Sequence, residues 1–179
     1  PGMSSPRFIH LRLHSEYSIS DGIVRIDDAV AAAAADGMPA LALTDLSNVF
    51  GLVKFYQAAR GDGVKPIVGC DVWISNEQDR DKPHRALLLC QNRGGYLTLC
   101  ELLSRAYRAN QHRGRAELKK SWFTELDTRG LIALSGAAHG DVGQAILADN
   151  EPQAELLARS WASLFPDRFY LELQRTGRP

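Results

Sequence analysis

Residues 8–18 run Phe8-Ile9-His10-Leu11-Arg12-Leu13-His14-Ser15-Glu16-Tyr17-Ser18, and they are followed by Asp21-Gly22 and then by Leu43-Thr44-Asp45-Leu46-Ser47-Asn48. In an extended strand, side chains two positions apart share a face and lie roughly 6.6 Å from each other. Two histidines at that spacing can hold one metal cluster. The neighbour of His14 on that face is instead Arg12, a permanent cation that cannot coordinate a metal. The pattern indicates the frame of a metal site in which a ligand has been replaced.

Short apolar runs alternate with helical patterns along the chain, and such alternation is typical of a parallel sheet wrapped by helices. Asp27 or Asp28 is a candidate N-cap of the first helix, which should end at Gly37. Spacing alone leaves open whether the sheet is doubly wound or closed into a barrel. Strands are expected near 8–14, 40–45, 65–74, 86–91, 131–136 and 169–174, and helices near 29–35, 50–60, 96–109, 120–126, 140–148 and 152–164.

The composition indicates one soluble domain. The chain has 179 residues, and 21 Lys and Arg balance 21 Asp and Glu, so there is no general attraction to nucleic acid or to an anionic membrane. No apolar run approaches the ~20 residues that span a bilayer, which predicts a cytoplasmic protein with no membrane contact. The three cysteines, Cys70, Cys90 and Cys100, lack C-x-x-C spacing, which predicts reduced thiols rather than a disulfide framework or a zinc site.

Several ordered motifs carry a resemblance to a known family. Besides residues 8–18 they are Ala42 to Gly51, Lys65-Pro66-Ile67-Val68-Gly69-Cys70-Asp71, Leu131-Ile132-Ala133-Leu134-Ser135-Gly136, Phe165-Pro166-Asp167-Arg168-Phe169-Tyr170-Leu171-Glu172-Leu173 and Arg175-Thr176-Gly177-Arg178-Pro179. In this order they resemble the polymerase-and-histidinol-phosphatase (PHP) domain at the N-terminus of bacterial DNA polymerase III alpha subunits. The likeness covers nearly the whole chain.

The resemblance implies an α/β fold, a distorted seven-stranded (β/α)7 PHP-type barrel with a metal cleft at the C-terminal strand ends. Only about six strands are expected here, and the family continues beyond Pro179. Residues 3–179 are therefore expected to form a PHP fragment that lacks the end of the barrel and the polymerase body. Pro1-Gly2, ahead of Met3, is interpreted as a cloning scar.

In metal-binding relatives, histidines and carboxylates from several strands hold metal ions that activate water against a phosphoester. Matching motif to motif, the resemblance implies a residual, degenerate site. The retained positions are His14, Asp21, Asp71 and His84, and the positions that have lost their ligand are Arg12, Leu46 and Ala137. The family's last ligands, an Asp-x-His pair, would lie beyond Pro179.

Loss of the imidazoles leaves cleft carboxylates without a cation, and buried carboxylates without a partner are costly. Arg12 is predicted to fill that gap by pairing with Asp21 or Asp71 in a structural ion pair. The alternative is that the cleft retains partial metal binding. His14 is then either a surviving ligand or a hydrogen-bonded core histidine.

Other polar residues admit two interpretations each. Asp45 is either an acid that supports the metal ligands without binding the metal itself, or the cap of the helix that begins near residue 50. The basic residues between 105 and 120 either contact template DNA or form a solvated loop, and the solvated loop is preferred because no aromatic stacking set accompanies them. His112 and His139 match no motif position and are expected at the surface.

The resemblance implies the N-terminal PHP module of a replicative DNA polymerase alpha subunit. The module itself is expected to be a non-catalytic scaffold that docks the proofreading exonuclease subunit and contains no cofactor. The parent chain would synthesise DNA with magnesium, together with other replicase subunits and primed DNA. The alternative is a metal-dependent phosphoesterase or 3′–5′ exonuclease that uses zinc or manganese in the residual PHP site.

Overall fold

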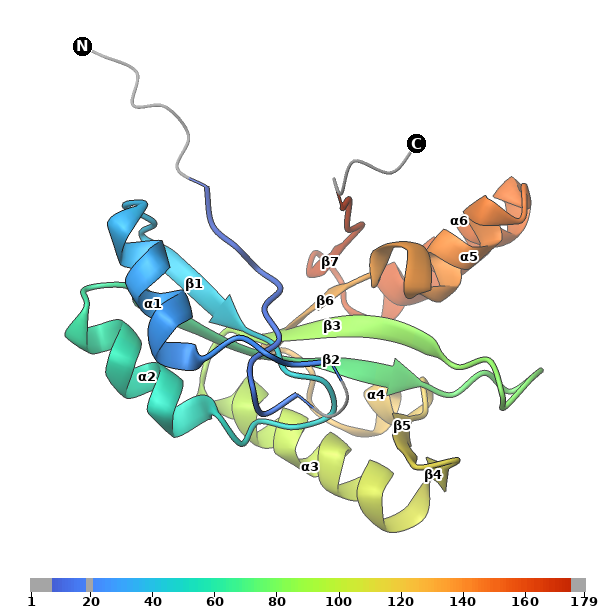
Figure 1. The fold of residues 1–179 in the computed structure, drawn as a ribbon. Coiled ribbons are helices and arrows are strands. Elements are labelled where there is room, and N and C mark those ends of the chain that lie inside the picture. Colours follow the sequence, from blue (N-terminus) through green and yellow to red (C-terminus); the bar gives the residue numbers. More distant parts are fainter. Residues whose placement is uncertain (1–7, 19–20, 175–179) are drawn as a thin grey trace. The chain divides into compact units, whose positions relative to one another are not determined.

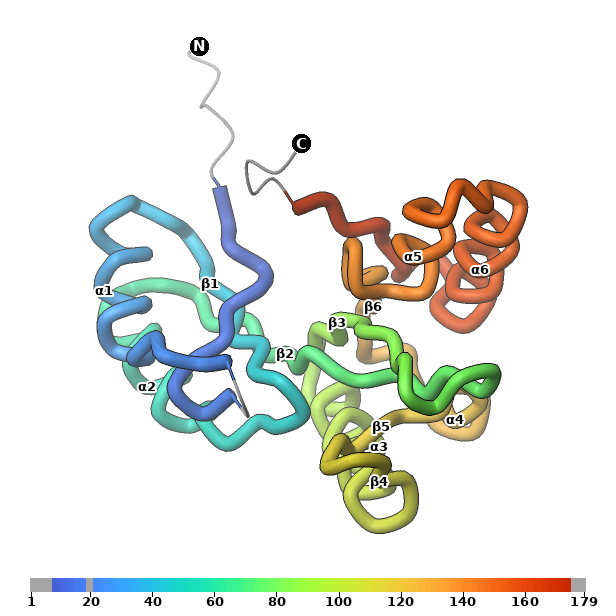
Figure 2. Tube along the Cα trace, turned by 45° about the vertical axis from the view of Figure 1, so that its right-hand side comes forward, coloured from blue at the N-terminus to red at the C-terminus, as the bar shows by residue number. Residues whose placement is uncertain are grey.

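The computed structural model describes residues 8–18 and 21–174, and the chain divides into two compact units, residues 1–70 and 71–179 (Figures 1 and 2). The predicted scar at residues 1–2 and the motif at residues 175–179 lie outside the described residues. Strand β2 (Lys65–Ile74) begins in the first unit and ends in the second. No helix in the described part of the chain is long and apolar enough to cross a membrane.

The first unit is a small parallel sheet with two helices. β1 (Ala40–Leu43) pairs with the start of β2 in parallel, from Ala40 opposite Lys65 to Leu43 opposite Val68. Helices α1 (Ile26–Ala35) and α2 (Leu52–Gly61) lie side by side in both views (Figures 1 and 2). Apolar side chains of these elements form its core, and they include Ile26, Val30, Leu41, Leu43, Phe55 and Ala59.

Residues 8–14 are not assigned as a strand, which corrects the prediction made for them. They still run beside β1, because the Ala42 amide donates to the His10 carbonyl at 3.0 Å and the Thr44 amide donates to the Leu13 carbonyl at 2.9 Å. This partial pairing fixes the segment that carries the first site residues without completing a ladder.

The two ends of helix α1 were predicted from local sequence signals, one wrongly and one correctly. Asp27 and Asp28 lie in the first turn, and the N-cap is Arg25, which makes no side-chain capping bond, so the predicted aspartate cap is wrong. The predicted end at Gly37 is confirmed. Gly37 has φ +67°, its amide donates to Ala34, and the Met38 amide donates to Ala33, which is a Schellman C-cap.

The second unit is built on an open sheet with strand order β4-β5-β2-β3-β6-β7. β2 is parallel to β5, β3 is antiparallel to β6, and β6 is parallel to β7. The strands are β3 (His84–Cys90), β4 (Gln111–His112), β5 (Arg115–Leu118), β6 (Leu131–Leu134) and β7 (Phe169–Tyr170). The predicted α/β class is confirmed, and an open sheet is what an incomplete barrel would show.

Helices α3 (Arg93–Ala109) and the pair α5 (Asp141–Leu147) and α6 (Glu151–Leu164) lie on different sides of β3 in both views (Figures 1 and 2). Two short helices, α4 (Trp122–Glu125) and the 3-10 turn η1 (Ala137–His139), complete the unit. An aromatic cluster packs together at α4, α6 and β7. Its members pack at ring-centroid distances of 5.1–6.2 Å, and they are Phe123, Trp161, Phe165 and Phe169.

Two predictions for the second unit are wrong. The basic residues around Arg115 do not form a solvated loop, because they include the end of α3 and the antiparallel β4–β5 pair, in which His112 lies opposite Arg115. The last predicted strand, 169–174, is a strand only at Phe169–Tyr170. Beyond it the Glu172 amide donates to Ser135 Oγ at 2.9 Å, so a side chain replaces the backbone ladder there.

Candidate functional site

In the first unit, His14 and Asp21 form a hydrogen-bonded pair. His14 Nδ1 lies 2.8 Å from Asp21 Oδ2, and Ser18 Oγ donates to Asp21 Oδ1 at 2.9 Å. The His14 side chain is 15% exposed and that of Asp21 is 48% exposed, so the pair lies at the surface of the unit. A carboxylate held on Nδ1 fixes the orientation of the ring and leaves Nε2 as its remaining hydrogen-bonding or ligating atom.

Asp45 anchors the segment that carries His14. Its carboxylate is 1% exposed and accepts from the Ser15 amide at 2.5 Å and from Ser15 Oγ at 2.8 Å. Burial raises the pKa of the Asp45 carboxyl above its usual value, and the bonds from Ser15 only partly oppose that effect. Helix α2 begins without a side-chain cap, so the interpretation of Asp45 as its cap is wrong.

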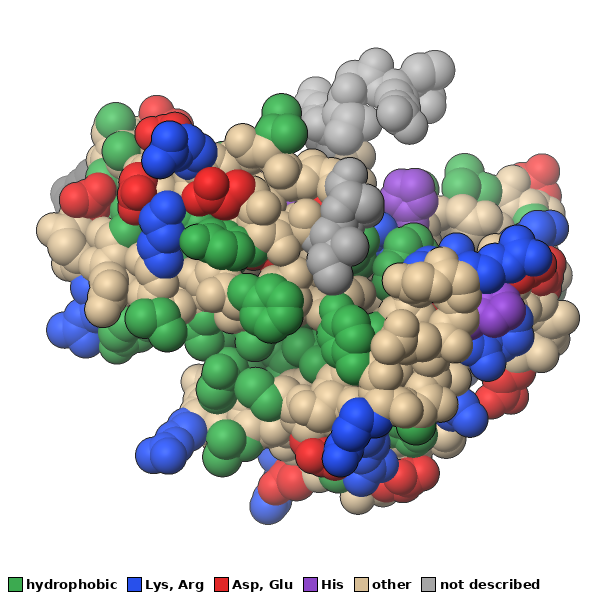
Figure 3. Space-filling view, turned by 60° about the horizontal axis from the view of Figure 1, so that its bottom comes forward, with side chains coloured by type: hydrophobic (Ala, Val, Ile, Leu, Met, Phe, Trp, Pro, Cys, Tyr) green, Lys and Arg blue, Asp and Glu red, His purple; other side chains and the backbone are tan. Residues whose placement is uncertain are grey.

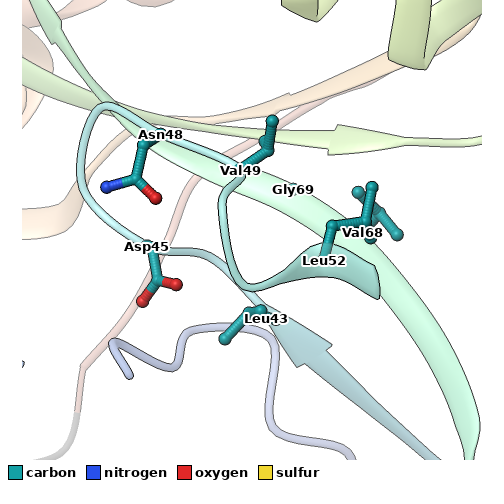
Figure 4. Close-up of a pocket in the computed structure, with 7 residues that line it drawn as sticks. All are labelled: Leu43, Asp45, Asn48, Val49, Leu52, Val68 and Gly69. Atoms are coloured by element: carbon teal, nitrogen blue, oxygen red, sulfur yellow. The ribbon is translucent and has the colours of Figure 1, made fainter. Parts of the chain in front are cut away.

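Leu46, at a position where the resemblance implies a lost ligand, is apolar and 4% exposed. The cavity next to Asp45, shown in Figure 4, has a volume of only about 10 Å³. That is about the space of one water molecule. The residues that line it are Leu43, Asp45, Asn48, Val49, Leu52, Val68 and Gly69. This part of the unit is therefore closed packing around a buried carboxylate and not a substrate pocket.

In the second unit, Asp71 forms a two-point ion pair with Arg85. The Asp71 side chain is completely buried, and its oxygens accept from Arg85 Nη2 at 2.5 Å and from Arg85 Nε at 3.2 Å. Arg85 is itself only 16% exposed. A guanidinium therefore occupies the coordination positions of this carboxylate, in the geometry that Arg and carboxylate favour.

A stack of side chains extends from this pair along the same face of the sheet. The Arg85 guanidinium lies 4.7 Å and that of Arg115 lies 5.5 Å from the centroid of the Trp73 ring. Arg115 in turn pairs with Glu117, a completely buried carboxylate, at 3.3 Å. We call the set Asp71, Arg85, Trp73, Arg115 and Glu117 the Arg–Trp–Arg stack.

Glu117 has further donors, since Arg80 Nη2 and Ser75 Oγ lie 3.2 and 3.1 Å from its Oε1 atom. Each buried carboxylate of the stack thus pairs with at least one guanidinium group. The guanidinium groups of Arg85 and Arg115 also both contact the ring of Trp73. Sequence reasoning missed this arrangement. The available signal was the period of two that places Asp71 and Trp73 on one face of β2.

His84 and Arg85 leave β3 on opposite faces, because successive side chains of a strand alternate. His84 lines a different cavity, together with Lys120 and Asp141. Burial lowers the pKa of the His84 imidazole below its ordinary value, and the Asp141 carboxylate offsets that effect only in part. The residue of β3 that meets Asp71 is therefore Arg85 and not His84.

The remaining positions supply no ligand cluster. Ala137 lies in η1 with φ +48°, and Arg12 is half-buried. Within residues 8–18 and 21–174, no three His, Cys, Asp or Glu side chains are gathered so that they could hold a metal ion. The donor set of the described residues therefore does not fit the multi-metal cluster of active relatives. The pairing of Arg12 with Asp21 or Asp71 stays a prediction.

The basic residues of α3 and the β4–β5 pair are largely neutralised. Arg105 pairs with Glu101 at 3.1 Å and with Glu125 at 2.7 Å, and Arg113 pairs with Asp81 at 3.0 Å. On the face drawn in Figure 3, side chains of both signs lie around a central area of hydrophobic side chains. Because these arginines already pair with carboxylates, we interpret them as structural residues and not as contacts for DNA phosphates.

Comparison with known proteins agrees with this architecture. The PHP domain family matches residues 10–176, and the chain belongs to that family. It is 51% identical over 176 residues to the DNA polymerase III subunit alpha of Neisseria meningitidis, 49% over 172 residues to that of Pseudomonas fluorescens, and 45% over 177 residues to that of Escherichia coli K12. These alignments cover 97%, 96% and 99% of this chain but only 15% of each relative.

Among solved structures, one described as a metal-dependent phosphoesterase from Bifidobacterium adolescentis matches with a TM-score of 0.53. The alignment covers 90% of this chain and 85% of that structure at 11% identity. At that identity the match shows the PHP-type fold and nothing about the chemistry.

Proposed function

We propose that this chain is the N-terminal PHP module of a replicative DNA polymerase alpha subunit and acts in the cytoplasm. The observation that carries the proposal is 45–51% identity along 96–99% of the chain to subunits of that name. The parent polypeptide would extend primed DNA with magnesium at acidic residues outside this chain, in a complex with other replicase subunits.

Within that polypeptide the module is a non-catalytic scaffold that docks the proofreading exonuclease. Support comes from two observations. Leu46, at a position where the resemblance implies a lost ligand, is apolar and buried, and Arg85 binds both oxygens of Asp71. Catalysis by metal-bound hydroxide requires several lone-pair donors around one ion. The described residues supply at most the His14–Asp21 pair in the first unit.

The test of the scaffold role combines metal content with turnover. The purified, untagged chain is expected to copurify with less than one zinc or manganese ion and to leave a model phosphodiester intact in 1 mM manganese. The alternative, a phosphoesterase or 3′–5′ exonuclease using the residual site, favours His14 and Asp21 because that pair survives. Chelator-sensitive hydrolysis that disappears in Asp21→Ala would establish that alternative, and Asp127→Ala, a change of an exposed acid, is the matched control.

The docking role is tested by co-elution with the cognate proofreading exonuclease on gel filtration. Two surface variants assign the contact to a unit: Phe50→Asp, at a side chain 74% exposed in the first unit, and Leu156→Asp, at one 64% exposed in the second. Loss of co-elution in one variant and retention in the other is the expected result. Separate elution of the unaltered chain from the exonuclease would contradict the docking role.

A further inference from the structure

The second unit contains a cavity of about 430 Å³ that the Asp71 site does not use. It lies where the end of β2 and the loop after it, the first residue of β3, the residues after β5, and helices α5 and α6 come together. Its volume is in the range of small-molecule pockets. Most of the residues that line it are polar: Ser75, Asn76, Glu77, Gln78, His84, Lys119, Lys120, Asp141, Gln144 and Gln153.

One cation of this wall is held in a fixed position. Lys120 Nζ lies 3.3 Å from Asp141 Oδ2 and 4.5 Å from the centroid of the Trp161 ring. Asp141 is already well supplied with donors, because Trp161 Nε1 lies 2.9 and 3.0 Å from its two oxygens and the Val142 amide donates to it at 2.8 Å. The carboxylate thus orients the ammonium group of Lys120 while most of its own hydrogen-bonding capacity is used within the protein.

The neighbouring cation has no such partner. Lys119 also lines the cavity, and among the described residues no carboxylate lies within salt-bridge distance of it. The carboxamides of Gln78 and Gln153 line the same space and likewise make no side-chain hydrogen bond with another described residue. Glu77 is the one lining acid besides Asp141, and it is exposed. The cavity is therefore lined by two lysines that are neighbours in the sequence and by neutral donors, against the exposed carboxylate of Glu77 and the Asp141 carboxylate that pairs with Lys120.

We propose that this cavity binds a small phosphate monoester. Its phosphate, which carries about −1.5 to −2 charges at pH 7, would lie between the ammonium groups of Lys119 and Lys120. Its organic part would occupy the remaining volume against the carboxamides and Leu157. The site is separate from the Arg–Trp–Arg stack, because His84 and Arg85 leave β3 on opposite faces. The inference does not depend on the proposed polymerase role.

The proposal is tested by calorimetric titration of the 179-residue chain at low salt with ribose 5-phosphate, ribose and inorganic phosphate. Ribose 5-phosphate is expected to bind at least tenfold more tightly than inorganic phosphate, and ribose is expected not to bind. Lys119→Ala should weaken the sugar phosphate at least tenfold, and Lys65→Ala, at an exposed lysine of the first unit, should leave it unchanged.

A second variant, Gln153→Trp, fills the cavity without changing its charge and should abolish binding while the thermal midpoint stays within about 2 °C. Three results would overturn the proposal: no heat with ribose 5-phosphate at millimolar concentration, equal affinity for inorganic phosphate, or undiminished binding in Lys119→Ala. Because Lys119 is exposed and makes no ion pair with a described residue, its removal should leave folding intact.

Discussion

Asp21 in the first unit and Asp71 in the second are both acids that the resemblance to the PHP family assigns to the residual metal site, yet their surroundings differ. Asp21 is 48% exposed and accepts from a histidine and a serine. Asp71 is completely buried and accepts from a guanidinium in two-point geometry. Water solvates an exposed carboxylate, whereas a buried one needs a full counter-charge. The two carboxylates are thus satisfied in two different ways, and burial sets the difference.

The largest expected effect is on the buried pair. Arg85→Ala leaves the Asp71 carboxylate with less counter-charge in a dry environment, and we expect it to lower the free energy of unfolding by about 3–5 kcal/mol. Urea denaturation followed by circular dichroism measures the change. The matched control is Arg129→Ala, because the Arg129–Asp127 pair is exposed at 86% and 58% and its loss should not move the midpoint measurably.

The double variant Asp71→Val/Arg85→Met separates the ion pair from simple packing. If the loss in Arg85→Ala comes from a stranded charge, the double variant should recover most of it, because no buried charge remains. A double variant as unstable as the single one would instead assign the loss to missing contacts, including those between Arg85 and Trp73. In that case, the difference between Asp21 and Asp71 could not be attributed to the charge of their partners.

These pairs also show how far sequence reasoning reached. Apolar runs located the central strands, and the predicted range 65–74 is that of β2, because a continuous buried run such as Cys70 to Val72 marks a strand covered on both faces. The β4–β5 pair was missed because Glu117 is a buried charge, and a charged residue in a short segment looks like a loop. Its burial depends on Arg80 and Arg115, contacts that no local pattern contains.

The site residues were harder to place for a geometric reason. His84 and Arg85 are adjacent, and a shift of one residue along a strand exchanges the two faces of the sheet. Matching by residue type favoured the histidine, whereas the residue opposite Asp71 is the arginine. The guanidinium that the structure shows on both oxygens of Asp71 is that of Arg85. The pairing of Arg12 with Asp21 or Asp71 stays a prediction.

Arg12 itself supplies the second prediction. It is half-buried and lies on the segment that runs beside β1. We expect Arg12→Ala to lower the free energy of unfolding by about 1–3 kcal/mol, less than Arg85→Ala, because loss of one partner leaves a polar group poorly satisfied but nearer to water. Urea denaturation of Arg12→Ala beside Arg25→Ala, at an exposed arginine of the same unit, gives the measurement. Equal urea unfolding midpoints for the two variants would show that Arg12 has no structural role.

The third prediction concerns Asp45, whose pKa in the folded protein is raised by burial. A carboxyl whose folded pKa is raised opposes folding when it is ionised, so this cost is present above the folded pKa. It disappears as the pH falls through that value toward the ordinary value of 3.8. Asp45→Asn removes the titration. The stability of the unaltered protein relative to Asp45→Asn should therefore increase as the pH falls from 7 to 4.

Parallel urea denaturation of the two proteins at pH 7, 5.5 and 4 follows that difference. The other acids titrate in both proteins and cancel in the comparison. A difference that stays constant with pH, or that changes in the opposite sense, would mean that the hydrogen bonds from Ser15 outweigh burial at Asp45. In that case the first unit would hold an ionised buried carboxylate without a guanidinium, and burial alone would not explain the contrast with Asp71.

The smallest effect is expected at Asp21. Asp21→Asn keeps an oxygen that can accept from Ser18 Oγ and removes a charge that is half exposed, so the free energy of unfolding should fall by only about 0–1 kcal/mol. Asp71→Asn, the same change at the buried position, should cost several times more because Arg85 keeps its charge. The ratio of the two losses, measured by urea denaturation at pH 7, tests directly whether burial sets the difference between the units. Equal losses would show that Asp21 carries structural weight beyond its contacts with His14 and Ser18, and the site of the first unit would then have to be regarded as a buried network like that of the second.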